Sequence, residues 1–414
     1  MENCEIKTYI VLEQLSYEKG KFHQFYRPGE HRLVFMLDEK YYRRFPIERR
    51  EYFDRLEVVK DFSYSNARAL VLDELQKVSS PAQVRLVCID ECNLLMVGKL
   101  REEFKIPGPT YQQLLPFRDK VKMKERLSRD GILVPRFYYP ERGEDEDRAL
   151  LYIRENIGFP VIAKPVDGAG SKETYEILNE CEFEAFCVRE KRWYEFQYEE
   201  LIRGTYFHCD SIILNGRVEI AEVSQYTVPC LEFAKGYMLG SYLLQEDSPI
   251  RSRILALNKK IVESLSSWSC VTHLELFHTQ TDELVFIEVA ARPAGCSIPL
   301  SIENGIGINL NEVAYRMELG LPNELNKKPL KPAAWLSFPI TQRGIVTETI
   351  EPILESSSTF IWKVNVGDII APATTSFDAS LEILLSNHNQ EELLKDVERL
   401  KQVNVLNVKE LEAA

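Results

Sequence analysis

The sequence predicts an α/β protein with more than one domain, and three observations lead to that prediction. The chain has 414 residues, more than one ordinary hydrophobic core accommodates, so we expect two to four domains. Residues 1–110 alternate strand-like and helix-like segments, which is typical of a small α/β domain. The later part contains pairs of strand-like segments joined by polar turns, which predicts hairpins.

Composition and charge narrow the class of protein further. With 45% hydrophobic and 28% charged residues, the chain resembles an ordinary soluble globular protein. A net charge of -13 argues against broad binding to nucleic acid or to a membrane surface, and we expect neither partner. The charged N-terminus and the lack of a long apolar run predict a cytoplasmic protein. Nine cysteines without a C-x-x-C pair predict reduced, buried thiols rather than a zinc site or disulfides.

The N-terminal elements follow from local patterns. Segments 9–12, 32–37 and 84–89 are apolar enough for buried strands, and segment 65–77 has the apolar spacing of a helix. The sequence Pro107-Gly108-Pro109 interrupts this pattern, and a helix is expected again over 118–129.

A predicted hairpin near residue 280 carries two acidic residues in its strands. Segments 274–277 and 284–289 alternate in polarity, and the polar segment 279–283 predicts the connection between them. If the loop is 280–283, counting outward from it places Glu275 directly opposite Glu288. Two like charges facing each other across a strand pair repel. We therefore expect a divalent cation to neutralise them, unless both lie on a solvated outer face.

Arg292 is expected on the same face as Glu288, because side chains alternate along a strand. Two carboxylates and one guanidinium predict a site for a metal ion and a phosphate group.

Segment 159–172 places Lys164 on a strand that runs into a loop of Gly168, Ala169, Gly170 and Ser171. Such a loop can wrap its backbone N–H groups around phosphate oxygens, although an ordinary glycine-rich turn has the same composition. Neither the Walker spacing nor the dinucleotide fingerprint is present, since Glu173 occupies the last glycine position of the latter.

A further hairpin is predicted around Asn215-Gly216, with strands over 207–214 and 217–223. The segment just before it contains Glu199, Glu200, Leu201 and Ile202. It can present a carboxylate and backbone groups to an adenine edge, or it can be an acidic surface turn.

Taken in order, these motifs resemble the carboxylate–amine ligases of the ATP-grasp superfamily, and L-amino-acid ligases in particular. The resemblance covers about residues 114–392 and includes Lys120, Lys164 with its glycine loop, Glu199, Glu275 and Glu288 with Arg292. It implies an α+β ATP-grasp module of two subdomains with a small C-terminal lobe, in which a helix is expected over 391–400. The implied divisions are an N-terminal α/β domain (1–112), a first ATP-grasp part (113–205) with a central lid subdomain (about 137–203), a catalytic subdomain (206–325) and a C-terminal lobe (326–414) that completes the catalytic domain.

The resemblance also implies a role for each matching residue. Lys120 and Lys164 correspond to the lysines that hold the nucleotide phosphates, and the glycine loop corresponds to a lid over them. Segment 199–202 corresponds to the adenine hinge. Glu275 and Glu288 correspond to ligands of magnesium, which manganese can replace, and Arg292 corresponds to the arginine that steadies the acyl-phosphate.

Three positions depart from the family pattern: Ala290 stands where most relatives have asparagine, Tyr206 where glutamate is usual, and Glu173 where glycine is frequent. The first is shared by dipeptide-forming ligases of this family. The other two put fine nucleotide contacts in doubt.

The implied reaction uses ATP to convert a small-molecule carboxylate into an acyl-phosphate, which an amine then converts into an amide. Residues 296–299, and less directly His208 and His273, are the candidates for contacts with the substrates, although a histidine on a strand is more often structural. Cys296 is not expected to act as a nucleophile, because no base accompanies it. Two alternatives are a ligase whose second substrate is an acyl carrier protein, recognised by basic residues near Arg43 and Arg50, and a nucleotide-binding protein without catalysis. A homodimer is common among the relatives.

Overall fold

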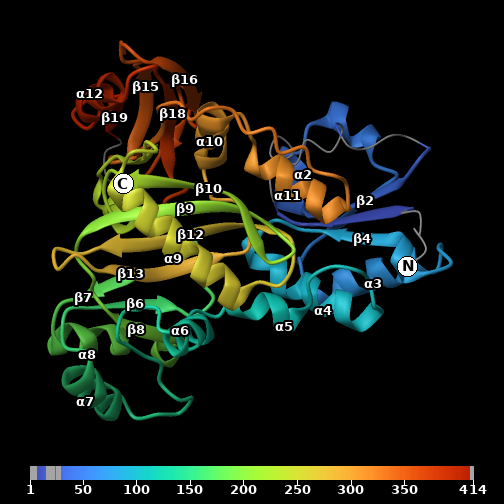
Figure 1. Ribbon diagram of the computed structural model, residues 1–414, viewed down its shortest axis with the longest axis horizontal. Helices are drawn as coiled ribbons and strands as arrows, with labels where there is room; N and C mark the ends of the chain where they lie inside the picture. The colour runs from blue at the N-terminus through green and yellow to red at the C-terminus, as the bar shows by residue number, and fades with distance from the viewer. Residues whose placement is uncertain (1–6, 15–23, 25–28, 411–414) are drawn as a thin grey trace.

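The N-terminal domain is a parallel sheet with helices beside it. The computed structural model describes residues 7–14, 24 and 29–410, and its N-terminal sheet has the order β3-β2-β1-β4 (Figure 1). The strands are β1 (Thr8–Leu12), β2 (Arg32–Asp38), β3 (Arg55–Val59) and β4 (Val84–Val87), and the helices are α2 (Glu39–Arg44), α3 (Tyr64–Leu75) and α4 (Leu94–Phe104). The predicted strands are confirmed, although β4 ends two residues before the predicted boundary. Because ligands bind beyond the carboxyl ends of such strands, the segment after β4 can reach a functional site.

A second, smaller sheet has the order β5-β8-β6-β7 and is antiparallel. It comprises β5 (Phe137–Tyr138), β6 (Val161–Pro165), β7 (Tyr175–Ile177) and β8 (Phe196–Glu200). Helices α7 (Glu146–Asn156) and α8 (Glu180–Arg189) bury Ile153, Phe183 and Phe186 against it. The short helix α5 (Tyr111–Leu114) and helix α6 (Lys120–Arg129) connect this sheet to the N-terminal domain. Asp119 caps α6, so the predicted helix begins two residues later than expected.

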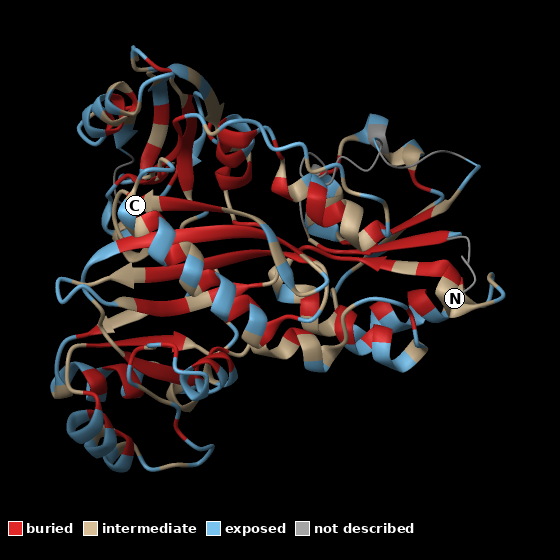
Figure 2. Ribbon diagram, viewed as in Figure 1, coloured by how far each residue is buried: buried red, intermediate tan, exposed pale blue. Residues whose placement is uncertain are grey.

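The centre of the molecule is an eight-stranded sheet of order β13-β12-β9-β10-β11-β14-β18-β16. Its strands are β9 (Thr205–Leu214), β10 (Arg217–Tyr226), β11 (Leu239–Leu243), β12 (Cys270–His278), β13 (Leu284–Ala290), β14 (Ala333–Pro339), β16 (Ser357–Trp362) and β18 (Ala379–Ser386). Asn215 and Gly216 both have positive φ, which confirms the predicted two-residue turn between β9 and β10. Helix α9 (Pro249–Leu265) lies across this sheet, and the inner strands β9, β12, β14 and β18 are buried along most of their length (Figures 1 and 2).

The last part of the chain completes the central sheet and adds a small lobe. Helices α10 (Ile298–Ile306) and α11 (Leu310–Leu319) precede β14, and a three-stranded sheet of order β17-β15-β19 follows from β15 (Gly344–Thr349), β17 (Ile369–Ile370) and β19 (Leu406–Glu410). Helix α12 (Gln390–Leu400) confirms the predicted C-terminal helix. The α/β class is confirmed, and the proposed domain boundaries stay a prediction.

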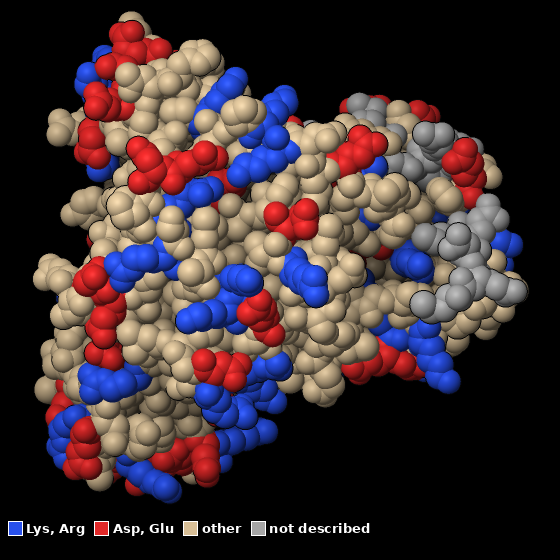
Figure 3. Space-filling view, viewed as in Figure 1, with Lys and Arg blue, Asp and Glu red and all other residues tan. Residues whose placement is uncertain are grey.

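The structure also bears on the expectations for surface charge, membrane spans and cysteines. Figure 3 shows acidic and basic side chains interspersed on the face that it draws. Among the described residues, no helix combines the length and apolar character needed to cross a bilayer. The described cysteines are all free thiols, and four of them are buried as predicted: Cys88, Cys187, Cys209 and Cys270. Cys230 and Cys296 are only partly buried, and the prediction is wrong for Cys92 and Cys181, which are exposed. Cys4 lies outside the described residues.

Candidate active site

The two glutamates of the predicted hairpin face each other. Strand β12 pairs with β13 in antiparallel register, and Glu275 lies directly opposite Glu288. The predicted connection 279–283 is confirmed, but the register counted from a loop of 280–283 is wrong by one residue beside the turn, because His278 pairs with Leu284. The register then shifts by one residue at Ile287, where β13 has a bulge. This shift compensates for the longer loop, so Glu275 still lies opposite Glu288 as predicted. Ala290 lies opposite His273 in the same ladder.

Glu275 is held by neutral and cationic donors from three strands. It is only 8% exposed, so a solvated outer face is excluded for this residue. The hydroxyls of Tyr206 and Tyr226 donate to its two oxygens at 2.7 Å each. The Nε2 atom of His273 lies 3.4 Å from the same oxygen that Tyr226 contacts. Burial alone would raise the pKa of Glu275, but the hydrogen bond and charge of His273 outweigh it and lower that pKa.

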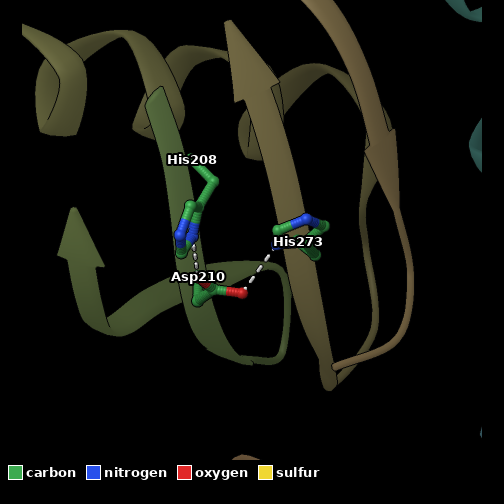
Figure 4. Close-up of side chains that lie close together, drawn as sticks. All are labelled: His208, Asp210 and His273. Atoms are coloured by element: carbon green, nitrogen blue, oxygen red, sulfur yellow. Dashed lines mark hydrogen bonds and ion pairs between the residues drawn. The ribbon is translucent and has the colours of Figure 1, made fainter. Parts of the chain in front are cut away.

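Behind Glu275 lies a buried network of two histidines and one aspartate (Figure 4). Asp210 on β9 accepts from His208 at 2.6 Å and from His273 on β12 at 2.9 Å, through a different oxygen each time. The other ring nitrogen of His208 lies 2.8 Å from the Oγ atom of Ser241. Burial alone would lower the pKa of His273, but the carboxylates of Asp210 and Glu275 raise it to about 10. His273 is therefore an imidazolium at neutral pH, and its charge faces Glu275.

This cluster also has the composition of a metal site, since the ligand atoms of His208, Asp210 and His273 lie within 4.8 Å of one another. Both Nδ1 atoms are already hydrogen-bonded to the Asp210 carboxylate. The geometry therefore assigns the three residues to a charge network rather than to metal binding. Of the two histidines, only His273 lines the cavity described below.

Two lysines pair with Glu199, and a third, Lys120, lies beside Glu288. Lys164 on β6 and Glu199 on β8 lie on the same face of their sheet and form an ion pair of 2.5 Å. Lys124 contacts the other oxygen of Glu199 at 2.9 Å, and burial chiefly lowers its pKa to about 8. The Nζ atom of Lys120 lies 3.6 Å from Glu288 and donates to the carbonyl of Gly168 at 2.6 Å.

The adenine role expected for segment 199–202 stays a prediction. The carboxylate of Glu199 is paired with lysines and that of Glu200 with Arg136. All four residues of the segment still line the cavity, so its backbone remains the candidate hinge.

Glu288 is more open than Glu275, with 35% of its side chain exposed, and it faces the same cavity. Partial burial would raise its pKa, but Lys120, Lys164, Lys124 and Arg292 lower it. Glu288 is thus a carboxylate at neutral pH.

Arg292 lines the cavity beyond Glu288, as predicted, and a residue that the sequence did not single out holds it. Glu91 follows β4 of the N-terminal domain, and the Nε atom of Arg292 donates to it at 2.7 Å. Arg118 donates to the other oxygen of Glu91 at 2.5 Å. The only sequence signal for Glu91 is its place at the carboxyl end of a parallel strand.

One cavity of about 520 Å³ joins these groups. Its lining includes the charged residues Lys120, Lys164, Glu275, Glu288 and Arg292 together with the glycine loop. It also includes uncharged side chains: Tyr226, Cys230, Leu239, Cys296, Ile298 and Trp335. Ser297, also predicted near the substrates, instead donates a hydrogen bond to Glu382 and does not line the cavity.

The donor set fits a magnesium ion. Mg²⁺ prefers few carboxylates together with phosphate oxygens, and Glu275 and Glu288 offer facing carboxylates beside two phosphate-binding candidates, Lys120 and Lys164. The oxygen of Glu275 that accepts from Tyr206 keeps a second lone pair, so the hydrogen bonds leave room for a metal bond.

Known proteins share this fold and part of this sequence. No protein-family model matches the chain. The chain is 28% identical over 352 residues to an L-arginine-specific L-amino acid ligase of Bacillus subtilis, which covers 81% of this chain and 83% of that protein. Among solved structures, an L-amino acid ligase from Bacillus licheniformis has a TM-score of 0.75 at 17% identity, over 99% of this chain and 100% of that one.

A second solved structure is the biotin carboxylase domain of 2-oxoglutarate carboxylase from Hydrogenobacter thermophilus, in complex with MgADP. It has a TM-score of 0.66 at 13% identity, over 98% of this chain and 92% of that one. Together, the solved structures establish the ATP-grasp fold. The predicted resemblance to ATP-grasp carboxylate–amine ligases is confirmed.

Proposed function

We propose that this chain, a homologue of an L-amino acid ligase with the ATP-grasp fold, is an ATP-dependent ligase that joins an amino acid to an amine through a carbon–nitrogen bond. The observation that carries the proposal is the facing pair Glu275 and Glu288, which shares one cavity with Lys120, Lys164 and Arg292. A structural hairpin has no need of two opposed carboxylates, whereas phosphoryl transfer needs groups that bind cations and phosphates in one place.

Each group of cavity-lining residues has a role in this reaction. Lys120 and Lys164 bind phosphate oxygens of ATP, and the backbone of segment 199–202 meets the adenine. The glycine loop covers the phosphates. When bound by Glu275 and Glu288, Mg²⁺ supplies neutralisation of the phosphate charge.

The carboxylate of the first substrate attacks the γ-phosphorus of ATP, and ADP leaves. The amine of the second substrate then attacks the acyl carbon, and phosphate leaves with the electrons of the broken carbon–oxygen bond and takes up the proton that the amine nitrogen loses. Arg292 stabilises the negative charge that develops in both steps, a contribution of about 3 kcal/mol for one well-placed donor.

The uncharged side chains that line the cavity form the candidate site for the amino acid. Trp335, Tyr226 and Leu239 offer an apolar surface to its side chain, and Cys296 follows closely after Arg292 in the chain. The carboxyl group of the amino acid then reaches Arg292 while the side chain packs against the aromatic wall.

The alternative with a carrier protein has no support from these relatives, whose names specify ligases of free amino acids or carboxylases. The basic residues invoked for it are partly used within the chain, since Arg50 donates to the hydroxyl of Tyr42 at 2.9 Å and Arg43 pairs with Glu39. The side chains of Arg44 and Arg49 lie outside the described residues. We also propose that the enzyme is cytoplasmic and forms a homodimer, as one neighbour's biotin carboxylase domain does.

A coupled assay tests this function directly. Purified protein is mixed with ATP, magnesium and pairs of free amino acids, and both ADP release and dipeptide formation are measured. We expect at least one pair to give ADP and dipeptide in equal amounts, and hydroxylamine in place of the amine to trap the acyl group as a hydroxamate. Nucleotide binding without ADP release for any pair would support the non-catalytic alternative, and turnover only with a carrier protein would support the other.

A further inference from the structure

A turn of the C-terminal part of the chain reaches the rim of the cavity. It covers residues 374–378, between β17 and β18. One oxygen of Asp378 accepts four hydrogen bonds, from the backbone N–H groups and the hydroxyls of Thr374 and Thr375, at 2.9 to 3.0 Å. The neighbouring Ala373 donates to the carbonyl of Ile340, next to β14. The turn is therefore fixed to the central sheet and has a defined shape.

This turn touches both sides of the cavity mouth. The hydroxyl of Ser376 donates to the carbonyl of Gly170 in the glycine loop at 3.3 Å. The carbonyl of the same residue lies 3.9 Å from the Sγ atom of Cys296. Ser376 and Phe377 both line the cavity. A single rigid turn thus joins the glycine loop over the phosphates to the segment that follows Arg292.

Phe377 is the most informative residue of the turn. It is 64% exposed, which is costly for a large apolar side chain. Its ring packs on Gly170, and a Cβ atom at that position would overlap it. Gly170 has a φ of 64°, so the loop also needs glycine there for its backbone conformation. The ring of Phe377 occupies the space that a side chain at position 170 would need.

We propose that turn 374–378 is the docking point of the glycine loop, and that Phe377 is a positioning residue that holds the loop closed over the acyl-phosphate. The inference rests on the proposed ligase function and adds a specific role to residues that are distant in sequence from the nucleotide motifs. A loop held closed excludes water from the intermediate. When water enters, its oxygen bonds to the acyl carbon, the bond from that carbon to the phosphate oxygen breaks, and the products are the free acid and phosphate. ATP is then consumed without amide formation.

The variant Phe377→Ala tests the role in catalysis through the ratio of dipeptide formed to ADP released. We expect this ratio to fall about fivefold, the factor that corresponds to the loss of one modest apolar contact. Val366→Ala is the matched control, since Val366 is another exposed apolar residue of the same lobe that does not line the cavity. Phe377→Leu should recover much of the ratio, because leucine restores an apolar contact with Gly170. A wild-type ratio in Phe377→Ala would overturn the proposal while leaving the ligase function intact.

Hydrogen–deuterium exchange gives a readout that does not depend on turnover. Peptides that span residues 166–174 are followed in the whole protein with and without a non-hydrolysable ATP analogue and magnesium. We expect the analogue to slow exchange in the wild type and in Val366→Ala, and to slow it about fivefold less in Phe377→Ala. Equal protection in all three proteins would overturn the docking role. This comparison stays decisive even if no amino acid pair supports amide formation, an outcome that would refute the proposed function alone.

Discussion

The wall and the rim of the cavity are built in opposite ways. The wall consists of β9, β10, β12 and β13, where Glu275 is held by two tyrosines and by His273, which is paired with the buried Asp210. The rim consists of the glycine loop and turn 374–378, which meet through one hydrogen bond and an exposed ring. Charged groups fixed in a buried wall suit the stabilisation of a transition state, and surface loops that close suit the exclusion of water. The two regions should therefore respond differently to mutation: changes in the wall should reduce the rate, and changes in the rim should reduce coupling.

The largest effect is expected from Glu288→Gln, which removes one of the two facing charges with little change in shape. We expect kcat to fall about 10²- to 10³-fold, as for the loss of a group that acts on transition-state charge. Steady-state ADP release at saturating substrates measures this change. Glu283→Gln is the control, because Glu283 lies exposed in the turn of the same hairpin. If both variants keep the wild-type rate, the facing glutamates are not part of the machinery.

A smaller effect is expected from Glu91→Gln, which tests whether the wall extends into the N-terminal domain. Glutamine keeps an acceptor for Arg292 but removes the charge that Arg292 and Arg118 share. We expect kcat to fall about 10- to 100-fold, which is typical for the loss of a supporting partner of a functional group.

The control for that variant is Glu57→Gln, which breaks an ion pair with Arg55 elsewhere in the same domain. Both proteins should keep their fold in circular dichroism. An equal, small loss of kcat in the two variants would mean that Glu91 stabilises the domain without orienting Arg292.

The opposition of Glu275 and Glu288 could be predicted because a strand pair has a fixed side-chain period and a polar turn marks its end. The register beside the turn could not be predicted, because the pattern of polar and apolar residues shows neither the longer loop nor the bulge at Ile287 that compensates for it. The glycine loop and Lys164 were likewise visible in the sequence, since strand and loop are adjacent along the chain.

Contacts between distant segments could not be predicted in this way. Glu91 is 201 positions from Arg292, and Ser376 is 206 positions from Gly170. The sequence shows Tyr206 only as a departure from the family pattern, whereas in the structure its hydroxyl donates a hydrogen bond to the Glu275 carboxylate. No local period encodes such pairs, because they arise from how the sheets pack.

The mildest test of the wall uses Asp210→Asn and follows stability rather than rate. Because Asp210 and Glu275 raise the pKa of His273 from 6.5 to about 10, the protonated ring stabilises the fold fully below pH 6.5 and loses this contribution as pH rises towards 10. In metal-free protein, the free energy of unfolding from urea titrations should therefore fall more steeply between pH 7 and 9 in the wild type than in Asp210→Asn, by up to about 1.4 kcal/mol per pH unit. Asp282→Asn is the control, since Asp282 contacts His278 in an exposed turn where such pairs contribute little. Identical pH slopes in the wild type and Asp210→Asn would mean that Asp210 does not hold His273 as a cation, and the wall would then lack the buried charge pair that distinguishes it from the rim.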